Sequence, residues 1–359
     1  MRYTIGQLAE IIDGDRGKNY PKQDEFYPQG YCLFLNTGNV TKEGLIFEEN
    51  QFIMKEKDEA LRKGKLKRGD IVYTTRGTVG NAGYYNSSVP YENVRINSGM
   101  VILRSNGEIV DARFLYQILK SEYYRPYFKQ YCTGSAQPQL PIKNFSQIYL
   151  NVPDIKTQHR IADILSVYDD LIENNQRQIK LLEEAAQRLY KEWFVNLRFP
   201  GHENTKIVDG VPEGWQWCKV RDVADINSSA LPKNYKEDFI DYVDLGSVRC
   251  GHIETRTRYN LNEAPGRAKR CAKDGDIIWG MVRPNLKAYA LVTNPKETDV
   301  FSTGFAVLSA KKVPYSYLYC AVTQEEFVGY LVNATNGAAY PAVKPVHFEV
   351  ADILKPDDK

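Results

Sequence analysis

The most regular hydrophobic pattern of the chain lies near its middle, at residues 158–196. Its repeating positions alternate in steps of four and three, the spacing of a heptad seam along one side of an α-helix. No glycine or proline interrupts the pattern. The seam residues are Ile161, Leu165, Tyr168, Ile172, Asn175, Ile179, Leu182, Ala186, Leu189 and Trp193. Some 40 residues rising about 1.5 Å each predict a rod of roughly 60 Å, able to hold two domains apart.

This seam is narrower than the apolar face of an ordinary core helix, so we expect it to contact another long helix. A polar residue on such a seam, here Asn175, is typical of positions that fix the register of two helices. The alternative is one helix that packs only within its own domain.

The segments on either side of the helix resemble each other. Residues 4–11 parallel residues 219–226, and residues 69–72 parallel residues 275–278, while Pro153 matches Pro356. The offset therefore falls steadily, from 219 − 4 = 215 through 275 − 69 = 206 to 356 − 153 = 203. This order is typical of two copies of one unit, the second with shorter loops. We predict domains at residues 1–156 and 211–359, with the helix at 157–196 and a linker at 197–210 between them.

Each copy is predicted to mix strands and helices. Apolar runs at residues 70–75 and 100–103 favour strands, and the pattern at residues 114–128 favours a helix. The expected fold class is α+β, with two similar mixed α/β domains separated by a long heptad-patterned helix.

The amino-acid composition indicates the environment in which the chain is expected to occur. Its 359 residues are 43% hydrophobic and 26% charged, with a net charge of +2, as in soluble globular proteins. No apolar run approaches the roughly 18 residues of a membrane span, and the start lacks a signal-peptide pattern, so we expect a cytoplasmic protein. The six cysteines form no CxxC pair and the four histidines match no zinc-site spacing, so no metal site is expected.

The motifs of common catalytic centres do not occur in the sequence. There is no Walker A segment, no GxGxxG after a strand, no GxSxG elbow and no amino-methyltransferase motif. Residues 153–156 and 356–359 superficially resemble nuclease carboxylate clusters, but turns at strand ends explain them better. We therefore expect a non-catalytic chain.

Positive charge is locally concentrated, although the total is small. One cluster comprises Arg62, Lys63, Lys65, Lys67 and Arg68, and a second comprises Arg249, Arg256, Arg258, Arg267, Lys269, Arg270 and Lys273. Nucleic-acid binding requires such local positive potential. A solvated surface explains each cluster equally well.

The central region resembles the conserved region of type I restriction-modification specificity subunits. The resemblance rests on residues 153–166 and 169–175, and it continues through residues 178–183 and 189–194. It implies two target-recognition domains that each read half of a split DNA site, with conserved helices setting the unread gap. The implied partners are double-stranded DNA, two methylase subunits and motor-nuclease subunits. S-adenosylmethionine, ATP and Mg are expected on those partners, and no cofactor on this chain.

The sequence departs from that family pattern after the second domain. Full-length members carry a second long helix there, whereas Lys359 corresponds to Lys156, just before the helical repeat would begin. We expect a second copy of this chain or another helix to cover the exposed seam. The alternatives are a truncated or recombining cassette that is inactive alone, a self-contained DNA nuclease, and a coiled-coil scaffold without a nucleic-acid role.

Two loops in each copy are candidates for reading DNA. Base edges are read by side chains such as arginine, asparagine and glutamine, and close backbone approach requires small residues. The first loop, residues 74–81, offers Thr74, Thr75, Arg76, Gly77 and Asn81, and its counterpart at 281–287 offers Arg283, Asn285 and Lys287. An ordinary hairpin with an exposed arginine is the alternative.

The second loop, residues 133–139, has the same frame in both copies but different tips. It offers Gly134, Ser135, Gln137 and Gln139, with Lys143 after it, and its counterpart at 336–342 offers Gly337 and Tyr340, followed by Lys344 and His347. The replacement of Gln137 by Tyr340, and of Gln139 by Ala342, would let two copies read different half-sites. A purely structural turn is the alternative.

Overall fold

The computed structural model describes residues 1–47, 50–134, 137–335 and 341–357. The chain divides into two compact units, Met1–Gln176 and Arg177–Lys359, and each is described by itself. The division falls inside the long helix α6, Ile155–Tyr190. The long helix, predicted as a separate segment at 157–196, is thus shared between the two units.

Unit 1 is built around a four-stranded antiparallel sheet. Its strand order is β2 (Ala9–Asp13), β8 (Met100–Ser105), β5 (Ile71–Thr74) and β6 (Ala82–Tyr84). A second sheet contains β4 (Phe52–Ile53), β3 (Cys32–Leu35) and β7 (Val94–Ile96), with β3 and β7 parallel. Strand β1 (Arg2–Thr4) pairs with β9 (Tyr149–Asn151). The helices are α1 (Ile5–Leu8), α2 (Lys55–Ala60), α3 (Ala112–Lys120), α4 (Arg125–Lys129) and α5 (Ile142–Ser146), with 3-10 turns at Gln23–Glu25 and Thr37–Asn39.

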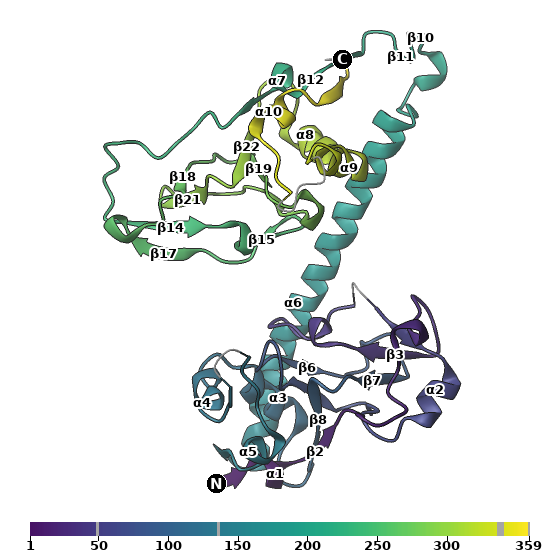
Figure 1. Cartoon of the computed structure of the whole chain (residues 1–359), viewed down its shortest axis with the longest axis vertical. Helices are drawn as coiled ribbons and strands as arrows, with labels where there is room; N and C mark the ends of the chain where they lie inside the picture. Colours follow the sequence, from purple (N-terminus) through teal and green to yellow (C-terminus); the bar gives the residue numbers. More distant parts are fainter. Residues whose placement is uncertain (48–49, 135–136, 336–340, 358–359) are drawn as a thin grey trace. The chain divides into compact units, whose positions relative to one another are not determined.

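The central sheet of unit 1 is covered on both faces (Figure 1). Ile71 and Tyr73 point into a core shared with the helices, whereas Val72 points into a core shared with the second sheet. Side chains alternate between the faces of a strand, so burial of both faces requires a continuous apolar run. This explains why residues 70–75 and 100–103 were correctly predicted as strands.

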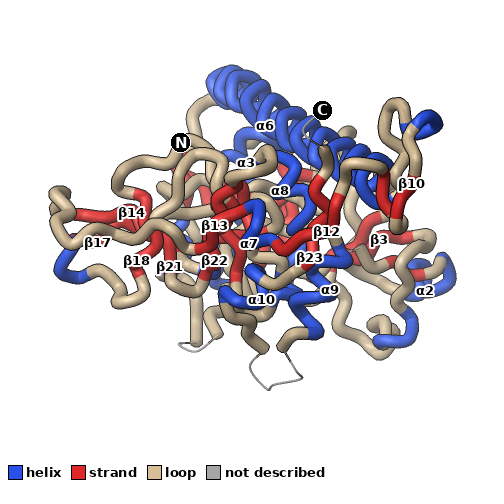
Figure 2. The backbone as a smooth tube through the Cα atoms, turned by 90° about the horizontal axis from the view of Figure 1, so that it is seen from above, coloured by secondary structure: helices blue, strands red, loops and turns tan. Residues whose placement is uncertain are grey.

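Unit 2 repeats the same plan. Its central sheet has the order β13 (Ala224–Ile226), β22 (Phe305–Ala310), β19 (Ile277–Gly280) and β20 (Tyr289–Leu291). The second sheet is β17 (Thr257–Asn260), β14 (Phe239–Val243), β21 (Asp299–Ser302) and β18 (Ala268–Arg270), with β14 and β21 parallel. Strand β12 (Gln216–Lys219) pairs with β23 (Asp352–Lys355), beside α7 (Val220–Val223) and α10 (Pro345–Glu349) (Figure 2). The remaining elements are β10 (Ile207–Val208), β11 (Val211–Pro212), β15 (Val248–Arg249), β16 (His252–Ile253), α8 (Tyr315–Val322), α9 (Glu325–Asn333) and 3-10 turns at His202–Asn204, Leu245–Ser247, Leu261–Glu263 and Pro284–Leu286.

The internal repeat also extends to single contacts. Gly69 and Gly275 both have positive φ, 90° and 82°. The carboxylates that follow them, Asp70 and Asp276, accept hydrogen bonds from the backbone N–H groups of Lys67 and Lys273, each at 2.7 Å. Two mixed α/β units of one topology, joined by a long helix, confirm the predicted fold class.

The helix predicted at residues 114–128 is instead two helices, α3 and α4. The chain leaves α3 at Ser121, whose backbone is extended, and a new helix begins at Arg125. Pro126 lies in the first turn of α4, where its missing N–H costs no hydrogen bond. Inside one continuous helix the same proline would have removed a hydrogen bond.

Helix α6 begins two residues before the predicted start at residue 157, and a π-helical turn, Lys191–Val195, continues it. The Asp154 carboxylate accepts hydrogen bonds from the backbone N–H and hydroxyl of Thr157, at 3.1 and 2.7 Å. These bonds, the hydroxyl contact foremost, hold the pKa of Asp154 below its usual value. Asp154 therefore stabilises a helix start, in agreement with the structural interpretation of residues 153–156.

Candidate nucleic-acid interface

The two candidate loops of unit 1 meet on one surface. Arg76 and Gln139 form an isolated β-bridge, and the Leu140 N–H donates to the Thr75 carbonyl at 2.9 Å. The second loop closes on itself through paired backbone hydrogen bonds between Thr133 and Gln139, at 2.7 and 2.9 Å. The described residues of 74–81 and 133–139, which we call the loop pair, thus lie next to each other and form one candidate site. Separate sequence segments gave no indication of this contact.

Three of the predicted site residues shape the first loop from within. Thr74, Thr75 and Asn81 are buried. The Thr74 hydroxyl accepts from the Asn81 N–H at 2.9 Å, and the Thr75 hydroxyl donates to the Gly99 carbonyl at 3.1 Å. The Asn81 amide donates to the Val40 carbonyl at 2.9 Å. Because these groups are occupied, we assign them to the loop frame and not to direct DNA contact.

The exposed part of this site consists of glycines and polar residues of the two loops. Arg76 is half-buried, and its backbone N–H donates to Gly99 at 3.1 Å. Exposed residues of the predicted set are Gly77, Gly134, Gln137, Gln139 and Lys143, whereas Ser135 lies outside the described residues. A Cβ at Gly134 would lie 2.9 Å from the Gln137 carbonyl oxygen, and its φ is 85°. Glycine is therefore required for this turn.

Unit 2 has the corresponding loop contacts. The Arg283 N–H donates to the Pro341 carbonyl and the Val343 N–H to the Met281 carbonyl, both at 2.8 Å, and Val282 bridges Ala342. Val282 is therefore the counterpart of Arg76. Arg283 takes the place of Gly77, and both have positive φ, 50° and 69°.

The predicted site residues of unit 2 differ in exposure and in the contacts that their side chains make. Arg283, Asn285 and Lys344 are exposed, while Gly337 and Tyr340 lie outside the described residues. Lys287 is held by Glu325, with its Nζ 2.5 Å from Oε1. His347 Nδ1 accepts from the Lys344 N–H at 3.2 Å, so this ring stabilises the start of α10.

Two arginines near the loop pair of unit 1 were not predicted from the sequence. Arg16 donates to the Ser98 carbonyl at 3.2 Å, next to Gly99, and its side chain is 44% exposed. Arg125 donates to the Asn81 side chain at 3.2 Å. The only sequence signal for Arg16 was its turn-like surroundings, and none marked Arg125.

Many residues of the two basic clusters serve the fold. Lys65 pairs with Asp58 at 2.5 Å, Arg256 with Asp299 at 3.2 Å, and Arg258 with Asp241 at 2.9 Å. Arg68 donates to the Tyr91 carbonyl at 3.1 Å. These contacts favour the structural interpretation of both clusters.

Helix α6 packs on its units through a face next to the predicted seam. In unit 1, the buried Gln158 side chain bonds the backbone of Ile109, Pro153 and Asp111 at 2.9–3.1 Å, Ala162 is fully buried, and Asp169 accepts from Lys120 at 3.0 Å. In unit 2, Gln187 donates to Thr323 at 2.8 Å, and Tyr190 and Phe194 contact Tyr317. Most of these residues come directly after a seam residue in the sequence, so they lie about 100° around the helix axis from the seam.

The seam itself remains largely open in the single chain. Leu165, Tyr168, Ile172, Ile179, Leu182 and Leu189 are 38–69% exposed, and Asn175 and Ala186 are also exposed. Ile161 and Trp193 are half-buried, and Ile161 packs against the core of unit 1, which corrects the expectation that it would be exposed. A helix that uses one stripe for its own domains can present the other to a partner.

The described residues can be searched for metal-binding clusters, disulfides and membrane-spanning helices. No cluster of three or more histidine, cysteine, aspartate or glutamate side chains suited to a metal occurs among the described residues. All six cysteines, each described, are free of disulfides. None of the described helices has the length and apolar character needed to cross a bilayer.

Comparison with known proteins gives the family of the chain. Residues 1–184 match the type I restriction modification DNA specificity domain. The type I restriction enzyme HindI specificity subunit of Haemophilus influenzae is 31% identical over 194 residues, which cover 54% of this chain and 42% of that protein. The MjaVIII specificity subunit of Methanocaldococcus jannaschii is 26% identical over 359 residues, which cover 95% of this chain and 79% of its own length.

A crystal structure of the type I restriction-modification S subunit from M. genitalium shares the fold, with a TM-score of 0.55 and 15% identity over 99% of this chain and 84% of that one. The chain spans less than half the length of the HindI relative. The family match nevertheless extends over half of the sequence, through unit 1 and into α6. The predicted resemblance is therefore confirmed: the chain belongs to the family of type I restriction-modification DNA specificity domains.

Proposed function

We propose that this chain is a non-catalytic, DNA-reading subunit in which each unit recognises one half of a split target. The observation that carries the proposal is a repeated contact between two loops: Arg76 bridges Gln139 in unit 1, and Val282 bridges Ala342 in unit 2. The described residues of both units thus share this backbone contact but carry different side chains there. A shared frame with different tips can read two sequences with one architecture. Membership in the DNA specificity family supports this role.

The roles of the individual residues follow from side-chain chemistry. Arg76, Gln137 and Gln139 in unit 1, and Arg283 and Asn285 in unit 2, are proposed to contact base edges, because their groups can pair with bases in fixed geometry. Lys143 and Lys344 are proposed to contact phosphates, which attract any mobile cation. Gly77 and Gly134 would let the backbone approach the duplex closely.

The first test removes one candidate base contact at a time. Arg76→Ala or Arg283→Ala should each cost about 1–3 kcal/mol of binding free energy at one half-site and relax specificity only there. Binding of duplexes substituted in either half, measured with the assembled complex, separates the two sites.

Lys143→Ala is the matched control for this test. Loss of a phosphate contact should weaken binding of all sequences alike. It should also reduce the slope of log affinity against log salt concentration by about one. If the arginine variants behaved in the same way as Lys143→Ala, they would be phosphate contacts and not base readers.

We further propose that the chain acts in the cytoplasm within a larger assembly. Two methylase subunits with S-adenosylmethionine, and motor-nuclease subunits with ATP and Mg, would supply the chemistry. The open seam of α6 supports assembly, because exposed apolar residues in a regular heptad pattern are typical of helix–helix interfaces.

A partner helix should therefore cover this seam. The chain is expected to associate at micromolar concentration, through a second copy or another subunit's helix, and Ile179→Glu with Leu182→Glu should abolish that association because each places a charge in an apolar interface. Arg177→Glu, on the opposite side of the helix, is the control. Sedimentation of a stable wild-type monomer, with no partner captured by its seam, would refute the idea.

A further inference from the structure

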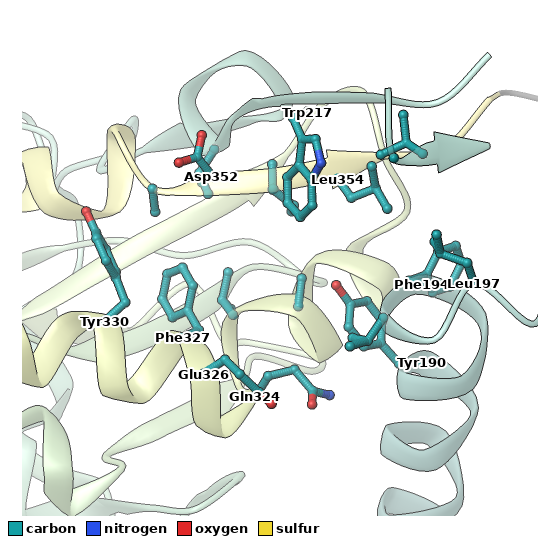
Figure 3. Close-up of a pocket in the computed structure, with 18 residues that line it drawn as sticks. Tyr190, Phe194, Leu197, Trp217, Gln324, Glu326, Phe327, Tyr330, Asp352 and Leu354 are labelled. Carbon is teal, nitrogen blue, oxygen red and sulfur yellow. The ribbon is translucent and has the colours of Figure 1, made fainter. Parts of the chain in front are cut away.

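Unit 2 contains an apolar cavity of about 460 Å³ whose role the loop pair does not explain. It lies among α9, the paired strands β12 and β23, and the end of α6 (Figure 3). Aromatic side chains supply much of the wall: Tyr190, Phe194, Trp217, Phe327 and Tyr330. A cavity of this size and character is typical of a binding site.

The internal repeat shows that the fold itself does not require this cavity. Ala321, Val322 and Ala351 line it. The equivalent residues of unit 1, at the constant offset of 203 (321 − 118, 322 − 119 and 351 − 148), are Ile118, Leu119 and Ile148, which are larger and buried. The equivalence of Ala351 and Ile148 is independently given by their carbonyls, which accept from Val220 and Ile5 at 2.9 Å. The second copy thus lacks side-chain volume that fills this place in the first.

The charges around the cavity are of one sign. Its charged lining residues are Glu326 and Asp352, and no lysine or arginine of the described part of the chain lines it. Lys219 pairs with Asp352 at 2.7 Å, so Glu326 is the acid whose charge remains more available. Aromatic faces also attract cations. An apolar ligand group with a positive charge next to it therefore fits this cavity better than an apolar group with no charge or a negative charge next to it.

The mouth of the cavity presents an exposed anchor. Trp217 is 61% exposed, and Val195 and Tyr330 beside the cavity are also exposed. Buried anchors of a protein interface typically insert into such aromatic-lined pockets, surrounded by a polar rim. The surface thus has the features of a docking site for a protein segment.

We propose that this cavity docks a segment of a partner protein that inserts one large apolar side chain and carries lysine or arginine next to it. The proposal goes beyond DNA reading, because no described residue of the candidate DNA-reading loops in either unit lines the cavity. The two proposals can therefore fail independently.

The test uses two dye-labelled peptides with the full chain, Gly-Lys-Leu-Phe-Lys-Gly and Gly-Glu-Leu-Phe-Glu-Gly, followed by fluorescence anisotropy. The basic peptide should bind, and the acidic one should bind at least about tenfold more weakly. Ala321→Ile combined with Ala351→Ile restores the residues of unit 1, so it should fold and lose binding about tenfold or more. Glu326→Lys should weaken binding of the basic peptide. Glu297 is an exposed acid of the same unit outside the cavity, so Glu297→Lys should leave that binding unchanged.

Equal affinity for both peptides, absence of binding, or unchanged binding by the filled variant would each overturn the proposal. Circular dichroism and thermal melting of every variant show whether it is folded. If the filled variant were unfolded, the Glu326→Lys and Glu297→Lys pair would decide, because both change the surface only. DNA binding by the same variants should remain at the wild-type level, which separates this site from the proposed target reading.

Discussion

The Asp58→Ala variant should lose about 3–5 kcal/mol of unfolding free energy, because it leaves a buried arginine without its carboxylate. Asp58 is 1% exposed and Arg95 5%, and Arg95 Nε lies 2.5 Å from Asp58 Oδ1. Arg95 also donates to the carbonyls of Leu61 and Lys63, at 3.0 and 2.6 Å. Denaturant unfolding, followed for unit 1, measures the loss.

Burial alone would raise the pKa of Asp58, but hydrogen bonds from Lys65 and Arg95 outweigh burial and hold the pKa below its usual value. A lowered carboxyl pKa stabilises the fold above the unfolded-state pKa, near 4, and this contribution is lost as the pH falls below it. The difference between wild type and Asp58→Ala should therefore shrink in acid.

Glu59→Ala is the matched control for this variant. Glu59 is the next residue, but its partner Lys55 is 3.9 Å away and both side chains are about 60% exposed. Such a pair contributes at most about 0.5 kcal/mol. If Asp58→Ala cost as little as Glu59→Ala at neutral pH, the buried pair would not stabilise unit 1.

The Trp279→Ala variant should lose a similar amount, about 3–5 kcal/mol, in unit 2. Trp279 is fully buried against Tyr289 and Phe348, and its indole N–H donates to the Val322 carbonyl at 3.0 Å. The variant creates a large cavity and leaves that carbonyl without this donor. Calorimetry should show a lower melting temperature for unit 2, with unit 1 unchanged.

The repeat supplies an informative control, Tyr73→Phe. Tyr73 occupies the position of Trp279 in unit 1 and stacks on Phe145, but its buried hydroxyl has no hydrogen-bond partner among the described residues. Removing an unsatisfied polar group should be neutral or stabilising. A large loss in Tyr73→Phe, or a loss below about 1 kcal/mol in Trp279→Ala, would contradict this account of the two cores.

The fold was predictable where one physical requirement dominates a segment. Strands β5 and β19 are buried on both faces, and a continuous run of apolar residues in the sequence predicts such burial. The repeat was visible because turn residues such as Gly69 and Gly275 must adopt positive φ. The break between α3 and α4 was not predicted, because the apolar spacing on both sides of Pro126 is also compatible with one continuous helix.

The candidate site was less predictable, because its geometry depends on contacts between distant segments. Thr74, Thr75 and Asn81 were as plausible for DNA contact as Arg76 until their hydrogen bonds to the loop frame were known. The seam of α6 was predicted, but the adjacent packing face is marked by polar residues such as Gln158 and Gln187. Their role as hydrogen-bond donors to the two units has no signature in hydrophobic spacing.

The most direct test of target reading by the loop pair is a loop exchange combined with mapping of methylated adenines in cells that carry the partner subunits. Residues 281–287 would be replaced by residues 75–81, an exchange of equal length. With a variant that melts at the wild-type temperature, the account predicts that one half of the methylated target changes while the other half is retained. An unchanged target, or a change in both halves, would contradict it.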